Sequence, residues 1–428
     1  MRDKITTIAL VSVVLSLLVA ACRPVPAPTP TPAQKVFKVG IAGPFTGPAA
    51  RTGREIKNSY TMAFEAIDYT IDNYKVELVW IDTESDPEKA TRAYEEAVLR
   101  DKIQAGAGGW HSSVAVALTE VTAKHKIPHF FHCGETHIVS DKVRSDLEKY
   151  GYWMTKGWPM PKRLVSLTYA VAFDDFIEAG LWPKEWKKIA IACEDTDFGR
   201  AVGEPLHKYL EERGWEVLAE DYFAIDETEF YPLLKKYKDM GAKVVLESAT
   251  AAVAGSSFIK QAREMGVEAL LIGHGLGWIG EWYELTGEAS DYTLDQIPQL
   301  ASPEAKKWAR EFEEKWGFKP SPSSGGLAYD WANMFIEMCK ATLKEYGELT
   351  SETLYKFGRE KLWTGEFTYT DGVIMPRYRF TLDSVPDPVV GKEDFLFPVI
   401  QYFGGKGVVL WPLDWKEADL KIPPWMKK

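Results

Sequence analysis

Cysteine, positive charge and enzyme signatures are all scarce in this sequence, and each scarcity excludes a class of protein. Besides Cys22, the 428 residues contain only Cys133, Cys193 and Cys339, and an odd number of scattered cysteines is not a disulfide framework. A formal net charge of −11 argues against nucleic acid as a partner and provides no basic patch for a membrane surface. The folded part must therefore be stabilised by a hydrophobic core.

Enzyme motifs are missing as well. The sequence has no Gly-x-Ser-x-Gly elbow, no His-Glu-x-x-His and no paired-carboxylate signature of a hydrolase. Asp197–Gly199 spells the Asp-Phe-Gly magnesium motif of protein kinases, but neither a glycine-rich phosphate loop nor a His-Arg-Asp loop accompanies it. We therefore expect a protein that is not an enzyme and that needs no cofactor.

The long apolar run at the N-terminus, Ile5–Ala21, follows Arg2 and Lys4. A basic start, an apolar stretch and small residues before a cleavage point are typical of a secretory signal peptide, although the run is also long enough for an uncleaved membrane anchor. The ending Val-Ala-Ala-Cys22 resembles the lipobox of bacterial-type lipoproteins, which implies a signal peptide over residues 1–21 and lipidation of Cys22. We therefore predict an extracytoplasmic protein that is anchored to the membrane through lipid on Cys22.

Proline occupies every second position between residues 24 and 32. Such a segment stays extended and cannot pack a core, so residues 22–35 are interpreted as a spacer. The remainder is long enough for two domains of ordinary size. With 46% hydrophobic and 26% charged residues overall, the composition is that of a globular protein.

From Val36 onward, short apolar runs alternate with amphipathic stretches of helical length. Repeated strand–helix units with apolar strands predict an α/β fold with parallel sheets and helices on both faces. The expected strands form two series, separated by the Trp- and Pro-rich segment Trp153–Pro161. They are Val36–Ala42, Lys75–Ile81, Ile103–Ala107 and Ile127–Phe131, then Lys188–Cys193, Glu216–Glu220, Ala242–Leu246 and Ala269–Ile272. Later expected elements are the helices Pro303–Trp316 and Gly326–Tyr346 and the extended segments Ile374–Phe380, Phe397–Phe403 and Val408–Trp411.

The stretch Gly106–Ala117 is the most informative of the strand-to-helix turns. Gly108 and Gly109 allow a sharp turn after a buried strand. Ser112 or Ser113 is placed to cap the helix that follows. Because the N-terminus of a helix offers unpaired N–H groups and a positive dipole end, we expect an anion or a polar ligand atom to bind here.

Six segments stand in order along the chain: Ile41–Pro48, Gly109–Ser113, Ile189–Gly199, Phe258–Ala262, Ala328–Trp331 and Trp363–Gly365. No single segment is specific, but their order and spacing cover Val36 to about Phe380. Taken together, they resemble the branched-chain amino acid type of periplasmic solute-binding protein (type I) that serves ABC importers.

The resemblance implies two Rossmann-like lobes joined by three crossings, which close over a ligand and deliver it to permease subunits. It implies a first lobe of residues 36–155 plus about 285–362, and a second lobe of 156–284 plus about 363–428. The crossings are expected near Tyr152–Pro161, Gly275–Gly287 and Lys361–Phe367. Ligands of open α/β sheets lie beyond the carboxyl ends of the strands, which is where the loops between these elements fall.

Two cleft positions depart from the pattern of relatives that bind amino acids. Ser112 and Ser113 match the serines that hold a ligand carboxylate, whereas the threonine position of the fourth strand loop falls on Glu135. The acid that pairs with a ligand ammonium falls near Gly275. Since a carboxylate beside Glu135 is repelled and a buried ammonium needs a counter-charge, an ordinary α-amino acid is disfavoured.

Aromatic and imidazole side chains stand in the same loops. Tryptophan offers a flat face and an N–H, so Trp110, Trp153, Trp158, Trp278 and Trp282 indicate a larger, flatter ligand than valine, with packing of the hinge as the alternative. The histidines near Cys133 and Glu135 follow no closed zinc spacing, so hydrogen bonding to a polar ligand is preferred over a metal. The candidate ligand-binding residues are Trp110, His111, Ser112, Ser113, Cys133, Gly134, Glu135, Trp153, Phe198, Thr250, His274 and Gly275.

The sequence thus predicts an extracytoplasmic solute-binding lipoprotein of an ABC importer. The expected solute is small and organic: amino acid-like, amide, aromatic or hydroxylated. A ligand-sensing receptor of the same fold is the first alternative, and a hydrolase is the second.

Overall fold

The computed structural model describes residues 34–426. The predicted signal peptide, the lipidation site Cys22 and nearly all of the proline-rich spacer lie outside these residues. Among the helices within 34–426, none combines the length and the apolar character that a bilayer crossing requires.

Two β-sheets organise the chain. The first has six strands, in the spatial order β2 (Thr70–Ile71), β3 (Tyr74–Asp82), β1 (Lys35–Gly43), β4 (Ala105–Gly108), β5 (His129–Phe131) and β6 (Trp153–Lys156). The second has seven, in the order β13 (Lys406–Trp411), β12 (Val399–Phe403), β11 (Leu294–Gln296), β10 (Leu270–His274), β9 (Val244–Ser248), β7 (Lys188–Glu194) and β8 (Glu216–Phe223). We call the two sheets with their helices the first and second lobes.

Parallel pairing dominates both sheets, as the apolar strands predicted. β1, β4, β5 and β6 are parallel neighbours in the first lobe. β8, β7, β9, β10 and β11 are parallel neighbours in the second, where β12 and β13 add an antiparallel edge. Every residue of β4, β9 and β10 is buried, which is the burial that a parallel sheet covered on both faces requires. The predicted α/β fold is confirmed.

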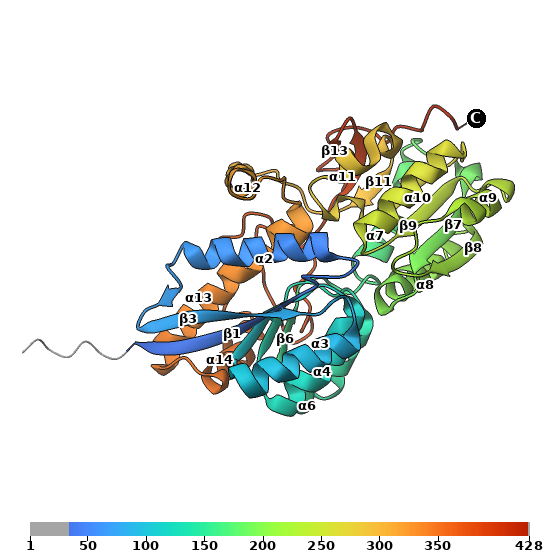
Figure 1. The fold of residues 1–428 in the computed structure, drawn as a ribbon. Coiled ribbons are helices and arrows are strands. Elements are labelled where there is room, and N and C mark those ends of the chain that lie inside the picture. Colours follow the sequence, from blue (N-terminus) through green and yellow to red (C-terminus); the bar gives the residue numbers. More distant parts are fainter. Residues whose placement is uncertain (1–33, 427–428) are drawn as a thin grey trace, which may run out of the picture. The chain divides into compact units, whose positions relative to one another are not determined.

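Helices cover both faces of each sheet (Figure 1). In the first lobe α2 packs against α13 and α3 against α4; in the second, α7 packs against α8 and α9 against α10. These helices span Ala50–Glu65 (α2), Pro87–Glu96 (α3), Ser112–His125 (α4), Val165–Glu178 (α7), Asp197–Glu211 (α8), Tyr231–Asp239 (α9), Ala252–Glu264 (α10) and Ala328–Tyr346 (α13). The remaining α-helices are α5 (His137–Ser145), α6 (Leu147–Tyr150), α11 (Trp282–Thr286), α12 (Pro303–Trp316) and α14 (Ser351–Phe357).

Helix starts follow from local chemistry. The Asp86 carboxylate accepts from the N–H of Lys89 at 2.9 Å, and Pro87 follows it as the first residue of α3. Ser302 caps α12 in the same way, with Pro303 behind it. The side-chain oxygen accepts from an N–H of the first turn that has no partner within the helix, and proline suits the first helical position because it has no N–H of its own. Both helices therefore begin where the sequence indicates.

The chain passes between the lobes three times. It leaves the first lobe after β6, returns after β11, and joins the second sheet again at β12. The expected second crossing at Gly275–Gly287 is therefore wrong, because Leu294–Gln296 still pairs within the second sheet. A strand of three residues carries too little hydrophobic pattern to be recognised from sequence.

The segment after Trp363 also differs from expectation. Asp330 of α13 accepts from the backbone N–H groups of Val373 and Ile374, and Arg144 of α5 donates to the carbonyl of Val385. These residues therefore pack on the first lobe, although the sequence placed everything after about residue 363 in the second. Ile374–Phe380 is not a strand; it contributes only a single bridge between Tyr369 and Tyr378.

Glu55 of α2 binds two segments, one that precedes β11 and one that follows the second crossing. Its carboxylate accepts from the N–H of Gly280 at 3.2 Å, from the N–H of Ser321 at 3.0 Å and from the Ser324 hydroxyl at 2.6 Å. Burial raises the pKa of Glu55 to about 7, although Arg51 and these hydrogen bonds oppose the rise. A single buried carboxylate of the first lobe thus binds the β10–β11 connection at Gly280 and the Ser321–Ser324 segment.

Candidate functional site

The carboxyl ends of the parallel strands bring the predicted loops of the two lobes together. Three contacts join them directly. The N–H of Asp197 donates to Ser113 Oγ at 3.3 Å, the rings of Trp110 and Trp278 meet edge-on with centroids 5.3 Å apart, and Glu135 Oε1 lies 3.8 Å from His274 Nε2. The candidate site therefore lies at the face where the lobes meet.

The start of α4 forms one wall of this face. Gly108 and Gly109 both have positive φ angles, of 80° and 117°, and a Cβ on Gly109 would come within 1.9 Å of the Phe131 ring. The sharp glycine turn is therefore present as predicted, and the space beside the second glycine is filled by Phe131.

The expected serine cap of α4 is wrong. The helix begins at Ser112 with His111 in the cap position, and no side chain caps it. Ser112 Oγ instead accepts from the N–H of Thr136 at 3.2 Å, and Ser113 Oγ accepts from Asp197. The two serines are therefore the first two residues of the helix, where Ser112 binds the neighbouring loop and Ser113 binds the opposite lobe.

Trp278 is the centre of a group of rings drawn from both lobes. Its centroid lies 5.3 Å from Trp110, 5.7 Å from Trp158, 5.4 Å from Phe198 and 5.3 Å from His274, with interplanar angles of 60–90°. We call these five residues the Trp278 ring cluster. The indole N–H groups of Trp110, Trp158 and Trp278 are buried and have no acceptor among the described residues.

Two buried acids flank His274 of this cluster, with Glu135 Oε1 3.8 Å from its Nε2 and Asp295 Oδ1 3.8 Å from its Nδ1. The side chain of the first, Glu135, is 2% exposed, and neither carboxylate oxygen has a hydrogen-bond partner among the described residues. Burial raises the pKa of Glu135, while His274 and Lys156 oppose the rise. Beside it, Asp295 accepts from the N–H of Gly277 at 3.0 Å and from the Tyr402 hydroxyl at 2.8 Å. One of the two buried acids is thus satisfied by the protein and the other is not.

His111 and His132 are buried, and neither ring nitrogen of either residue has a partner among the described residues. Burial lowers the pKa of His111 to about 4 and that of His132 to about 3, so both imidazoles are neutral at pH 7. Within residues 34–426, no three His, Cys, Asp or Glu side chains are grouped as a metal site requires.

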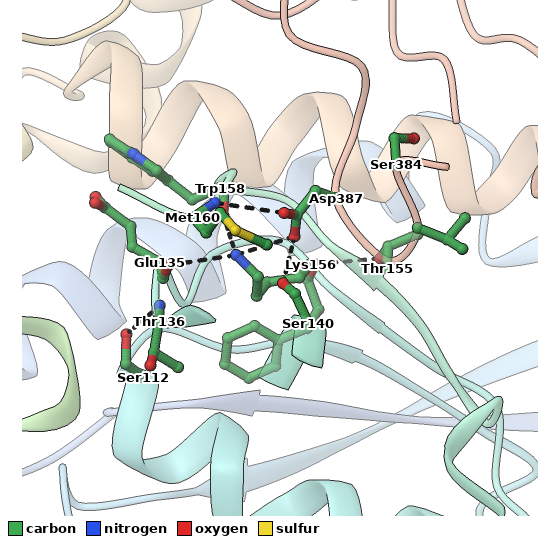
Figure 2. A network of polar contacts seen from close by, with 12 residues as sticks. Ser112, Glu135, Thr136, Ser140, Thr155, Lys156, Trp158, Met160, Ser384 and Asp387 are labelled. Carbon is green, nitrogen blue, oxygen red and sulfur yellow. Dashed lines mark hydrogen bonds and ion pairs between the residues drawn. The ribbon is translucent and has the colours of Figure 1, made fainter. Parts of the chain in front are cut away.

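A buried ion pair supports the loop that carries Glu135. Lys156 Nζ lies 3.1 Å from Asp387 Oδ1 and donates to the carbonyls of Trp158 at 2.6 Å and Glu135 at 3.4 Å. The Ser140 hydroxyl donates to the same Asp387 oxygen at 2.8 Å. Figure 2 shows this network, with the Glu135 carboxylate pointing away from Lys156. Lys156 thus binds the backbone of Glu135 and leaves its side chain free.

The other predicted residues take different positions. Trp153 stacks on His129 at 4.8 Å within the first lobe, and Trp282 packs on Tyr402 at 4.0 Å within the second. Thr250 donates its hydroxyl to Glu194 at 2.7 Å. Gly275 has a positive φ of 109° and donates its N–H to Asp295 at 3.4 Å. Cys133 is buried, which raises its pKa, and Gly134 beside it has a φ of 77°.

Sequence reasoning missed three residues that shape the site. Lys156 and Asp387 were not singled out, although a lysine at the end of an apolar strand was a usable signal. Asp295 gave no signal, because its partners Gly277 and Tyr402 are 18 and 107 residues away.

The chain resembles known proteins over most of its length. Residues 36–379 match the model of a family described as periplasmic binding protein. The Leu/Ile/Val-binding protein homolog 7 of Brucella suis is 22% identical over 322 residues, covering 72% of this chain and 77% of the relative.

Solved structures show the same architecture. A protein from Silicibacter pomeroyi, described as a branched-chain amino acid ABC transporter, superposes with a TM-score of 0.75 at 18% identity, covering 92% of this chain and 100% of that chain. A solute-binding protein of an ABC transporter from Rhodopseudomonas palustris, in complex with 3,4-dihydroxybenzoic acid, gives a TM-score of 0.70 at 19% identity, covering 87% of this chain and 95% of that chain. These similarities establish the two-lobed fold.

Proposed function

The chain belongs to the periplasmic binding protein family, and from this premise we propose that it captures a small organic solute between its two lobes for an ABC importer. The family resemblance expected from the sequence is confirmed. Membership implies an extracytoplasmic location and a protein that binds its substrate without converting it.

One observation carries the proposal for the site. Buried polar atoms without protein partners gather where the lobes meet, and they come from both lobes: the Glu135 carboxylate, both nitrogens of His111, Nε2 of His274 and the indole N–H of Trp278. Leaving a buried polar group unpaired costs about 1–3 kcal/mol, so such groups are rare unless they serve a purpose. A solute that binds here would satisfy donors and acceptors of both lobes at once.

The relatives support a range of solutes. The Brucella suis relative is named for leucine, isoleucine and valine, and the Rhodopseudomonas palustris structure holds an aromatic acid. The Trp278 ring cluster favours a flat solute over a branched aliphatic one, because aromatic faces stack well on planar groups. We therefore propose an amino acid-like, amide, aromatic or hydroxylated compound as the solute.

Two measurements test this proposal. Native mass spectrometry of the purified protein should show one bound small molecule per chain. A thermal-shift screen should find compounds that raise the melting temperature, since a ligand at a hundredfold excess over Kd adds about 2.7 kcal/mol of stability. If no small solute binds in either experiment, the proposed function is wrong.

The membrane anchor and the permease are further parts of the proposal. Lipidation of Cys22 would hold the protein at the membrane where the permease lies. A Cys22→Ser variant should leave the membrane fraction and lose incorporation of a labelled fatty acid, whereas Cys339→Ser, at a buried cysteine, should remain in the membrane. Membrane retention of Cys22→Ser would contradict the lipid anchor.

A further inference from the structure

We propose that the solute is an organic cation with N–H donors, such as an ammonium, amidinium or guanidinium compound, which pairs with Glu135 and lies against the Trp278 ring cluster. This inference rests on the proposed function and specifies the chemical class of the solute. It differs from what the names of the relatives indicate, since those solutes carry a carboxylate.

The Glu135 carboxylate is placed to pair with a cation, because the part of the chain that the structure describes supplies no hydrogen-bond donor to it. Both of its oxygens are buried without a hydrogen-bond donor, and the nearest base, His274, is 3.8 Å away, beyond hydrogen-bond distance. The loop is nevertheless held firmly, because Lys156 binds the carbonyl of Glu135 and Ser112 accepts from Thr136. Figure 2 shows the carboxylate directed away from both anchoring contacts, so it is free to receive N–H groups from a solute.

The charges around Glu135 favour a cation over an anion. The titratable groups that act on it are His274, Lys156 and Asp295. Lys156 is already paired with Asp387 at 3.1 Å, and Asp295 adds a second buried acid. A solute carboxylate here would face Glu135 with no uncommitted lysine among these groups, whereas a cation would relieve an unpaired buried acid.

The Trp278 ring cluster also favours a cation, and it adds a second requirement for the solute. A cation within about 6 Å of an indole face is attracted to the ring, most strongly when it is desolvated, and three indoles belong to the cluster. Their N–H groups lack acceptors, so the solute should also carry an uncharged acceptor such as a carbonyl or hydroxyl oxygen. A flat cation with one such oxygen would pair with the Glu135 carboxylate and would also offer an acceptor to the indole N–H groups.

Glu135→Gln removes the charge and keeps the size of the side chain; within residues 34–426 it breaks no hydrogen bond, and the one ion pair that it removes is the 3.8 Å contact with His274. Because both oxygens are unpartnered, the fold should melt at or above the wild-type temperature. Glu247→Gln is the matched control: Glu247 is also fully buried with two unpartnered oxygens, but a Cβ on Gly255 would lie 3.5 Å from its carboxylate, so it faces α10.

The test is calorimetric titration with sets of similar shape and different charge. The sets are benzamidine, benzamide and benzoate; 4-hydroxybenzamidine, 4-hydroxybenzamide and 4-hydroxybenzoate; and leucinamide, leucine and 4-methylpentanoate, with 3,4-dihydroxybenzoate added. We expect a cation to bind at least about tenfold more tightly than its neutral and anionic counterparts. Glu135→Gln should remove that preference, and Glu247→Gln should keep it.

Every outcome of this titration either supports or overturns the inference that the solute is a cation. Tighter binding of a neutral or anionic member, or a cation preference that survives Glu135→Gln, overturns this inference and leaves the solute-binding proposal standing. If none of these compounds binds and native mass spectrometry finds no solute, both are overturned. If none binds but the protein carries a co-purified solute, the charge of that solute decides: an anion or a neutral molecule overturns the inference and a cation supports it.

Discussion

The N–H of Asp197, the first residue of α8, donates a hydrogen bond of 3.3 Å to the Oγ of Ser113 in the first turn of α4. The bond links a helix start of one lobe to a helix start of the other, directly beside the Trp278 ring cluster. Lobe closure in this family of folds is a hinge motion around a ligand. We therefore expect this contact to help hold the two lobes together.

Ser113→Ala removes this contact and leaves the rest of α4 intact. A net hydrogen bond contributes about 0.5–1.5 kcal/mol, so solute affinity should fall about three- to tenfold while the melting temperature changes little. Calorimetry with the solute found in the thermal-shift screen measures the effect. Ser145→Ala is the control, since its hydroxyl bonds only to the Lys142 carbonyl; equal losses in both variants would contradict the role of Ser113.

Glu55 should make stability depend on pH near neutrality. Its folded pKa is raised to about 7, chiefly by burial, so its contribution to stability is present at low pH and is lost as pH rises through 7. Between pH 5 and pH 8 the loss is on the order of 3 kcal/mol in the unfolding free energy. Glu55→Gln, followed by urea unfolding across this range, should flatten the curve relative to wild type; an identical slope would show that Glu55 does not titrate there.

Lys156→Met should strongly destabilise the fold. Removing one partner of a buried ion pair leaves the other charge uncompensated, which costs about 3–5 kcal/mol. The double variant Lys156→Met/Asp387→Asn should recover part of this loss, because no charge is then left buried. Lys124→Met is the exposed control, with a side chain 66% exposed beside Glu95, and should cost less than about 1 kcal/mol in urea unfolding. If Lys156→Met is as stable as Lys124→Met, the prediction is wrong.

Trp278→Phe tests the ring cluster. The phenyl ring keeps some packing, but it lacks the indole N–H and loses part of the contact that Trp278 makes with its four neighbouring rings. Solute affinity should therefore fall at least about tenfold. Trp182→Phe removes an indole that contacts Phe173 and Trp186 in the second lobe. Both variants should lose about 1–3 kcal/mol of stability, and only Trp278→Phe should lose affinity in titration. Wild-type affinity in Trp278→Phe would remove the cluster from the site.

The sequence predicted the sheets well and the contacts between distant segments poorly. The buried strand β9 opens with the apolar run Val244–Leu246, which lies within the predicted strand Ala242–Leu246, so its place in a parallel sheet could be predicted. β11 and the segment after Trp363 could not, because their positions depend on partners far along the chain, such as Asp330 with Val373.

The candidate site could likewise be predicted only in part. The loops at the strand ends were found because their place follows from the topology of an α/β sheet. The role of each side chain was not: Ser113 was expected to cap its own helix, and its hydroxyl instead receives the N–H of Asp197 from 84 residues away. The Lys156–Asp387 pair spans two crossings, so the position of Lys156 at a strand end could mark the lysine but not its partner.

Whether the solute lies between the lobes is tested most directly by titrating Ser113→Trp with the solute that stabilises the wild-type protein. An indole at this position would occupy the space where α4 meets α8. We predict one binding site per wild-type chain, no measurable binding to Ser113→Trp, and a melting temperature of the free variant within about 4 °C of wild type, as expected for a change of roughly 1 kcal/mol. Wild-type affinity in Ser113→Trp would contradict the account.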